Sequence, residues 1–139
     1  MLSKTAVYAL RAIASLAELD AGEFAGAGDL ADRLGAPRNY LGKLLRTLAD
    51  AGIVESQKGK GGGFRLAMPP ERVAVYDVVE PIDHVSRWRG CFLGRSRCSE
   101  KSPCAVHLRW AGVRDQYLRF LCETTVADLL QKSDRQPQL

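Results

Sequence analysis

The sequence predicts a mainly α-helical fold: a winged helix-turn-helix with a small β-hairpin wing, followed by a long C-terminal dimerisation helix. Three observations predict it: helical spacing of apolar residues before residue 50, a basic glycine-rich hairpin, and a narrow apolar seam after a cysteine-rich loop. We therefore expect a winged helix-turn-helix domain over residues 1–83, a cysteine-rich loop with a candidate metal site over 84–104, and a dimerisation helix with its tail over 105–139.

The first two predicted helices form the start of the helix-turn-helix. Residues 3–20 carry apolar side chains at helical spacing, and Ser3 is suited to cap the N-terminus. Arg11 interrupts this apolar run and no small-residue cleavage site follows it, so we interpret the run as a helix rather than a signal peptide. Residues 29–34 form a short second helix that Gly35 ends.

A third predicted helix starts near Pro37, which favours the first helical turn, and extends to about Asp50. Its apolar stripe consists of Leu41, Leu44, Leu45 and Leu48. Its other face carries Arg38, Asn39, Gly42, Lys43, Arg46 and Thr47. The helix is therefore amphipathic, with a polar surface available to a partner.

Two strands and two helices complete the prediction. Residues 53–57 and 64–67 are expected to pair as strands around residues 58–63, where glycine allows a tight turn. A short helix covers residues 75–82 and the last long helix covers residues 105–123. The last helix has apolar residues at alternating spacings of four and three, which favours packing against a second copy over packing on its own domain. The predicted dimer-interface residues are Val106, Trp110, Val113, Tyr117 and Phe120.

Charge and length narrow the class of protein. The chain has 139 residues, enough for one compact domain with an appendage, and a net charge of +4 that hints at a polyanionic partner. No run of 18 apolar residues occurs, so we expect no membrane partner and a cytoplasmic location. No nucleophile beside a base and no carboxylate pair stands out. The sequence therefore predicts neither an enzyme nor a small-molecule substrate.

The second and third helices and the hairpin form a candidate DNA-reading surface. Residues 32–65 carry seven basic side chains against three acidic ones. In a winged helix-turn-helix the second helix of the pair enters the major groove, where its N-terminal side chains reach base edges. The predicted DNA-binding residues are Lys4, Arg38, Asn39, Tyr40, Lys43, Arg46, Lys58, Lys60, Gly61 and Gly62.

These residues are expected to divide between bases and phosphates. The predicted base readers are Arg38, Asn39, Tyr40 and Lys43. Lys4, Arg46 and the wing lysines are expected to meet phosphates, with the wing glycines allowing close approach. The alternative is an ordinary helical domain with solvent-facing charges, in which Tyr40 is a core residue.

The pattern Cys91-x6-Cys98-x5-Cys104-x2-His107 is a candidate metal site. Thiolates suit zinc and iron–sulfur clusters, and the spacing of Cys104 and His107 lets both face one metal. Basic residues nearby are expected to lower the cysteine pKa values; these are Arg89, Arg95, Arg97 and Lys101.

Three interpretations of this site remain open on spacing alone. They are structural zinc, which is the commonest, an iron–sulfur sensor, and free thiols that act as a redox switch. A zinc-stabilised module that binds RNA or protein is the rival function. Cys122 stands apart from the other cysteines and is expected to be buried and inert.

Four features together resemble the IscR/NsrR/RirA family of winged-helix regulators. They are Ser3-Lys4 with Tyr8-Ala9-Leu10, Asn39-Tyr40-Leu41, the wing Gly59-Lys60-Gly61-Gly62-Gly63 and the triple-cysteine loop. The resemblance implies a homodimer that binds a palindromic operator in double-stranded DNA. It also implies an iron–sulfur cluster on the three cysteines, and so a repressor or dual regulator that senses iron–sulfur status, redox stress or nitric oxide.

The same resemblance addresses the cluster type. In IscR-like members a histidine shortly after the third cysteine completes a 2Fe-2S site, and His107 occupies that position. Some nitric-oxide sensors instead complete a 4Fe-4S site with a carboxylate from the partner's first helix. Here residues 4–17 contain no carboxylate, and the first acid is Glu18. A 2Fe-2S cluster is therefore expected, with 4Fe-4S and zinc as the alternatives.

Overall fold

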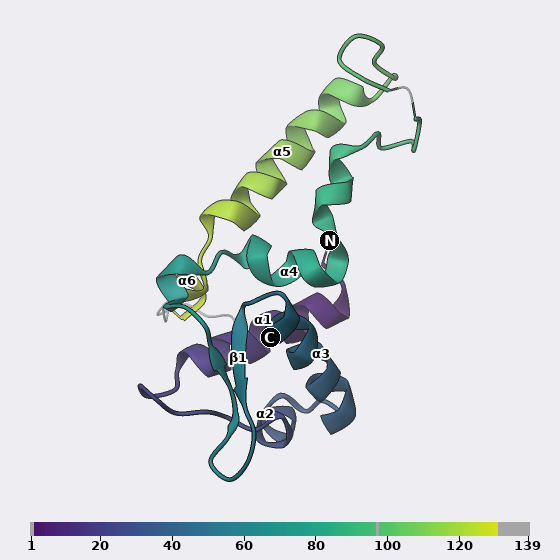
Figure 1. Ribbon diagram of the computed structural model, residues 1–139. Coiled ribbons are helices and arrows are strands. Elements are labelled where there is room, and N and C mark those ends of the chain that lie inside the picture. The colour runs from purple at the N-terminus through teal and green to yellow at the C-terminus, as the bar shows by residue number, and fades with distance from the viewer. Residues whose placement is uncertain (1, 97, 131–139) are drawn as a thin grey trace.

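A computed structural model describes residues 2–96 and 98–130. Its elements, in chain order, are α1 (Lys4–Ala17), α2 (Ala27–Leu34), α3 (Arg38–Asp50), β1 (Val54–Gln57), β2 (Gly63–Leu66), η1 (Pro70–Arg72), α4 (Val75–Asp83), η2 (Val85–Arg89), α5 (His107–Glu123) and α6 (Val126–Leu130). In Figure 1 all elements except η2 and α5 gather in one body, from which α5 projects with the cysteine loop at its far end. The mainly helical winged fold that the sequence predicts is confirmed.

Helix α1 lies at the centre of the body. Its Ser3 cap accepts a hydrogen bond from the Ala6 backbone N–H at 3.1 Å, as the sequence predicts. The helix ends at Ala17, three residues before the predicted end. Its buried face is Ala6, Ala9, Ala12, Ile13 and Leu16, and the alanines let α4 pack closely against it.

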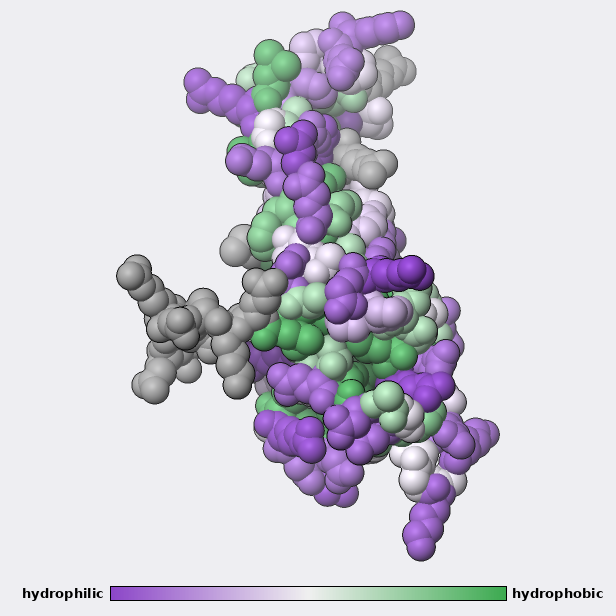
Figure 2. Space-filling view, turned by 90° about the vertical axis from the view of Figure 1, so that its left-hand side faces the viewer, coloured by the Kyte–Doolittle hydropathy of each residue, from purple (hydrophilic) through white to green (hydrophobic). Residues whose placement is uncertain are grey.

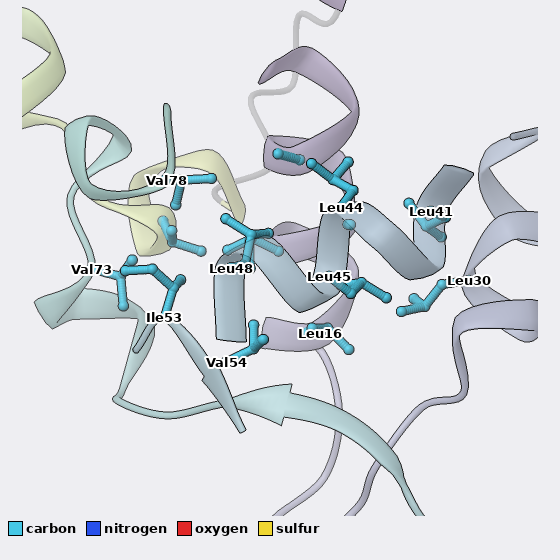
Figure 3. Packing of buried hydrophobic residues seen from close by; sticks show 14 of the residues in the cluster. Leu16, Leu30, Leu41, Leu44, Leu45, Leu48, Ile53, Val54, Val73 and Val78 are labelled. Carbon is cyan, nitrogen blue, oxygen red and sulfur yellow. The ribbon is translucent and has the colours of Figure 1, made fainter. Parts of the chain in front are cut away.

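The core of the body forms around the leucine stripe of α3. Gly35 ends α2 with a left-handed φ of 66°, which turns the chain sharply into α3. Figure 3 shows α3 leucines meeting side chains from α1, α2, β1 and α4. The labelled core residues are Leu16, Leu30, Leu41, Leu44, Leu45, Leu48, Ile53, Val54, Val73 and Val78, all buried. This packing leaves the opposite face of α3 toward solvent.

The wing is an antiparallel hairpin that is also attached to the loop before α2. Val54 pairs with Leu66 and Gln57 with Gly63. Phe64 exchanges two backbone hydrogen bonds with Ala25, at 2.8 and 2.9 Å. A Cβ on Gly63 would lie 2.4 Å from the Ala25 carbonyl oxygen, so only glycine allows the wing to sit this close to that loop.

After α5 the chain returns to the body. The Val126 N–H donates to the Val73 carbonyl at 2.8 Å, and α6 packs on α1. The sequence interpretation missed α6 and assigned this part of the chain to the tail of the dimerisation helix. The structure extends the helix to Leu130, and residues 131–139 of the predicted tail lie outside the described residues.

Helix α5 has little contact with the body. Within the described residues it packs against α4 and η2, and Leu121 is its one buried residue. Leu108, Val113 and Phe120 are 82%, 61% and 56% exposed. Figure 2 shows hydrophobic side chains among hydrophilic ones on the projecting part. Across residues 2–96 and 98–130, no helix combines the length and apolar character needed to cross a membrane.

Candidate DNA-reading face and cysteine site

Basic and polar side chains cover the solvent face of α3. Arg38, Asn39, Lys43 and Arg46 are all exposed. The Arg38 guanidinium forms an ion pair with Asp32 of α2 at 2.9 Å. It also lies against the backbone of Gly28, where an added Cβ would be 3.6 Å from its central carbon. Arg38 is therefore oriented toward α2 at the start of the predicted reading helix.

Tyr40 has contacts within the protein. Its hydroxyl donates to Thr5 Oγ1 at 2.7 Å, and its ring meets Tyr8 edge to face with centroids 5.9 Å apart. The residue is half-buried. These contacts tie α3 to α1, which matches the packing alternative for Tyr40.

The exposed face of α1 adds a second basic surface. The Lys4 ammonium and the Arg11 guanidinium lie 5.9 and 6.0 Å from the Tyr8 ring centroid. Arg11 was not among the predicted DNA-binding residues. Its spacing of seven residues from Lys4 places both on one helix face, which is a signal that the sequence contains.

Two lysines occupy the tip of the wing. Lys58 and Lys60 are exposed, and the adjoining Gly59 and Gly61 have positive φ, at +92° and +78°. A Cβ on Gly62 would lie 2.2 Å from the Gln57 carbonyl oxygen, so the turn also requires glycine there. In Figure 1 the wing tip and the cysteine loop lie at opposite ends of the molecule.

The cysteine site lies where the loop enters α5. The sulfur atoms of Cys91, Cys98 and Cys104 all lie within 4.8 Å of one another. The Cys91 and Cys104 sulfurs are 3.7 Å apart, and Cys98 Sγ is 3.2 Å from Nδ1 of His107. His107 begins α5 and its N–H donates to the Cys104 carbonyl at 3.1 Å. The structure thus brings all four predicted ligands together.

The thiols differ in acidity. Backbone N–H groups of Arg95 and Leu93 lower the pKa of Cys91 to about 7, against the effect of burial. A backbone hydrogen bond from Cys104 acts to lower the pKa of Cys98, but burial and the neighbouring thiols outweigh it and raise that pKa. Among the described residues, Arg95 acts through its backbone N–H, and neither its side chain nor that of Lys101 contributes to the shift at Cys91 or Cys98. Arg97 and the side chain of Arg89, which the sequence prediction also named, lie outside the described part of the chain.

Aromatic residues support the loop from α5. The Trp110 indole N–H donates to the Gly90 carbonyl at 3.2 Å, and its ring lies 5.3 Å from that of Phe92. Tyr117 stacks on Trp88 of η2 at 5.2 Å. A groove of about 430 Å³ is lined by Trp88, Trp110, Val113, Arg114 and Tyr117. Two members of the predicted dimer seam therefore also contact their own chain.

Cys122 is exposed, so its predicted burial is wrong. The reason is its place on α5, where Leu121 is buried against the body. One residue further along a helix turns the side chain by about 100°. That rotation directs Cys122 away from the body.

A series of hydrogen bonds leads from η2, which packs against α5, to α3, and two of its bonds join residues far apart in the sequence. The Ser86 N–H, on η2, donates to Glu80 Oε2 of α4 at 2.9 Å. At the end of α4, Asp83 accepts from the Ser3 N–H at 2.8 Å and from the Ser3 hydroxyl. Ser3 caps α1, whose Thr5 binds Tyr40. These hydrogen bonds therefore connect η2, which precedes the cysteine loop, to α3, the predicted DNA-reading helix.

Comparison with known proteins identifies the class. The model of the Rrf2 family, described as an iron-dependent transcriptional regulator, matches residues 2–132. A protein of Aquifex aeolicus, classed by name among HTH-type transcriptional regulators, is 33% identical over 137 residues, which are 97% of this chain and 94% of the relative. The regulator IscR of Aliivibrio salmonicida is 32% identical over 114 residues, covering 78% of this chain and 67% of IscR.

Solved structures share the fold. The T. potens IscR structure is 25% identical, with a TM-score of 0.74 over 94% of this chain and 85% of that one. CymR, the global cysteine regulator of B. subtilis, has a TM-score of 0.76 at 23% identity, over 94% and 95% of the two chains. These similarities confirm the winged-helix architecture.

Proposed function

This chain belongs to the Rrf2 family of transcriptional regulators, and from that premise we propose a homodimeric repressor or dual regulator whose operator binding is controlled by an iron–sulfur cluster. The family and its relatives are regulators rather than enzymes. The observation that carries the proposal is the convergence of three thiols and the His107 imidazole beside η2 and α5.

The donor set fits an iron–sulfur cluster. Three soft sulfur ligands lie within 4.8 Å of one another, and Nδ1 of His107, 3.2 Å from Cys98 Sγ, would complete the set. The lowered pKa of Cys91 favours the thiolate that binds metal. A Cys₃His set also suits structural zinc. The iron-dependent description of the matched family favours the cluster, and the His107 position favours 2Fe-2S over 4Fe-4S.

A dimer on palindromic DNA is the second part of the proposal. The exposed apolar side chains of α5 support it, because an unpartnered apolar helix favours association. Each subunit would insert α3 into the major groove and set its wing lysines against phosphates. The two half-sites would then be roughly 34 Å apart or a multiple of that spacing. A protein that binds chromosomal DNA in bacteria acts in the cytoplasm.

The chain's own contacts supply a route from the cysteines to the DNA. When bound, an iron–sulfur cluster supplies iron that responds to oxidants, nitric oxide and iron supply. Ligation fixes the loop relative to α5, where Trp110 holds Gly90 and Tyr117 stacks on Trp88. A shift of η2 acts on α4 through Glu80, and on α1 and α3 through Asp83 and Ser3. The two reading helices would change their separation, which is a population shift between dimer geometries.

The direct test is the visible spectrum of anaerobically purified protein, with iron, sulfide and zinc quantified. We expect structured visible absorption with iron and sulfide in matching amounts. Cys104→Ser should abolish it, whereas Cys122→Ser, at the exposed cysteine outside the site, should leave it unchanged. Colourless protein with stoichiometric zinc, and no cluster uptake on reconstitution, would replace the sensor with the zinc-stabilised alternative.

A further inference from the structure

Gly42 is an unexplained glycine in the middle of α3. The helix spans Arg38–Asp50, and Gly42 is in its second turn. Glycine is the least favourable helix-interior residue after proline. A Cβ added at Gly42 would meet no described atom within 4 Å, and its φ is not in the left-handed region. Neither packing nor backbone conformation within the described chain therefore requires glycine here.

The position of Gly42 relates it to the candidate DNA-reading face. Residues four apart lie above one another on a helix, so Gly42 lies in one row between Arg38 and Arg46. Both arginines are exposed. The Arg38 guanidinium is drawn toward α2 by Asp32 at 2.9 Å. The row thus has two long cations with bare helix backbone between them.

We propose that Gly42 is a specificity-determining position, at which the absent side chain admits the 5-methyl group of a thymine against the backbone of α3. This inference rests on the proposed function. Glycine offers a Cα–H surface and no side-chain donor or acceptor, so it matches an apolar feature. The thymine methyl is the apolar feature of base edges in the major groove. Arg38 and Arg46 would flank it and contact neighbouring bases or phosphates.

The test removes one methyl group from the DNA and, separately, adds one to the protein at position 42. The full chain, purified anaerobically, first selects a duplex from a randomised pool, and that duplex is the probe. Each thymine of a half-site is then replaced in turn by deoxyuridine, which lacks only the methyl. The wild-type protein should lose about fivefold or more in affinity at one position, as for one altered base pair. Gly42→Ala should bind the unmodified duplex more weakly by a similar factor and recover on the duplex with that deoxyuridine.

Gly112→Ala is the matched control. Gly112 likewise lies within a helix, α5, and its added Cβ meets no described atom within 4 Å. Gly112 is exposed, whereas Gly42 is half-buried. Both substitutions should raise the melting temperature, because alanine favours helix. Only Gly42→Ala should change the response to deoxyuridine. The rise in melting temperature would also show that Gly42→Ala is folded.

Two results would overturn the inference while leaving the proposed function intact. In one, Gly42→Ala binds the selected duplex as tightly as wild type. In the other, it loses affinity and no deoxyuridine position restores binding. If the wild-type protein selects no sequence at all from the pool, the proposed function fails, and this inference fails with it.

Discussion

The body of this molecule and its projecting arm, which comprises η2, the cysteine loop and α5, differ in what stabilises them. In the body, α1, α2, α3 and α4 each bury side chains in a shared core. In the arm, α5 has seventeen residues and within the described chain buries only Leu121. The body can therefore be specified by its own sequence pattern. The arm presents apolar side chains and a thiol site, and we expect it to gain stability from a second chain and from metal.

The largest expected difference lies between two leucines. Leu45 of α3 is 0% exposed and Leu108 of α5 is 82% exposed. Leu45→Ala should lower the free energy of unfolding by about 2–5 kcal/mol, because it removes core contacts and leaves a cavity. Leu108→Ala should change it by less than about 0.5 kcal/mol. Urea unfolding of both variants measures this, and equal losses would contradict the distinction between body and arm.

The next effect concerns association through the arm. Val113 is 61% exposed and lies on the predicted seam of α5. Val113→Asp would place a charge in an apolar interface, and should weaken dimerisation by about 1–3 kcal/mol, which is roughly fivefold to 150-fold in the dissociation constant. Sedimentation equilibrium measures the dimer dissociation constant.

Gln116→Asp is the control for charge, because Gln116 is exposed on α5 outside the seam. It should leave the dissociation constant nearly unchanged. If Val113→Asp dimerises as tightly as wild type, then the two copies do not meet along this seam.

The contrast between body and arm also explains what the sequence could predict. The helix-turn-helix and hairpin have periodic apolar residues and local signals such as Gly35 and the wing glycines, and the structure follows them closely. The four candidate ligands have short, local spacing, so their convergence was also predictable. Local patterns are read directly from sequence because each residue's role depends on its near neighbours.

Where a feature depends on the packing of distant segments, the sequence prediction either missed it or was wrong. Helix α6 has five residues and depends on the backbone bond between Val126 and Val73. The contact between Asp83 and Ser3 joins residues eighty positions apart. The exposure of Cys122 follows from how little of α5 touches the body. No local sequence pattern predicts helix α6, the contact between Asp83 and Ser3, or the exposure of Cys122.

The Asp83–Ser3 contact provides a third and smaller test, at the junction of arm and body. Asp83→Asn should lower stability by about 1 kcal/mol, because it weakens hydrogen bonds to a charged acceptor. It should also reduce the ratio of DNA affinities between cluster-loaded and cluster-free protein, measured by fluorescence anisotropy on the selected duplex.

Asp77→Asn is the matched control for Asp83→Asn. Asp77 accepts a backbone hydrogen bond from Ala74 at 3.0 Å, but this bond is local to the start of α4. Asp77→Asn should cost similar stability and leave the affinity ratio intact. An unchanged ratio in Asp83→Asn would mean that the cysteine loop acts on α3 by another route.

The smallest expected effect is the pH dependence of the contact between η2 and α4. Burial acts to raise the pKa of Glu80, but hydrogen bonds from Ser86 outweigh it and leave that pKa below its ordinary value. A carboxyl with a lowered pKa in the folded state adds stability above its unfolded pKa, and this stability is lost as the pH falls through the folded pKa.

Glu80→Gln should therefore be less stable than wild type at neutral pH, by less than about 1 kcal/mol because the site is only partly shielded. The difference should shrink below about pH 4.5. Thermal unfolding between pH 3 and 7 measures it, with Glu71→Gln at an exposed carboxylate as the control. A difference that stayed constant across this range would mean that Ser86 does not stabilise the charged form of Glu80.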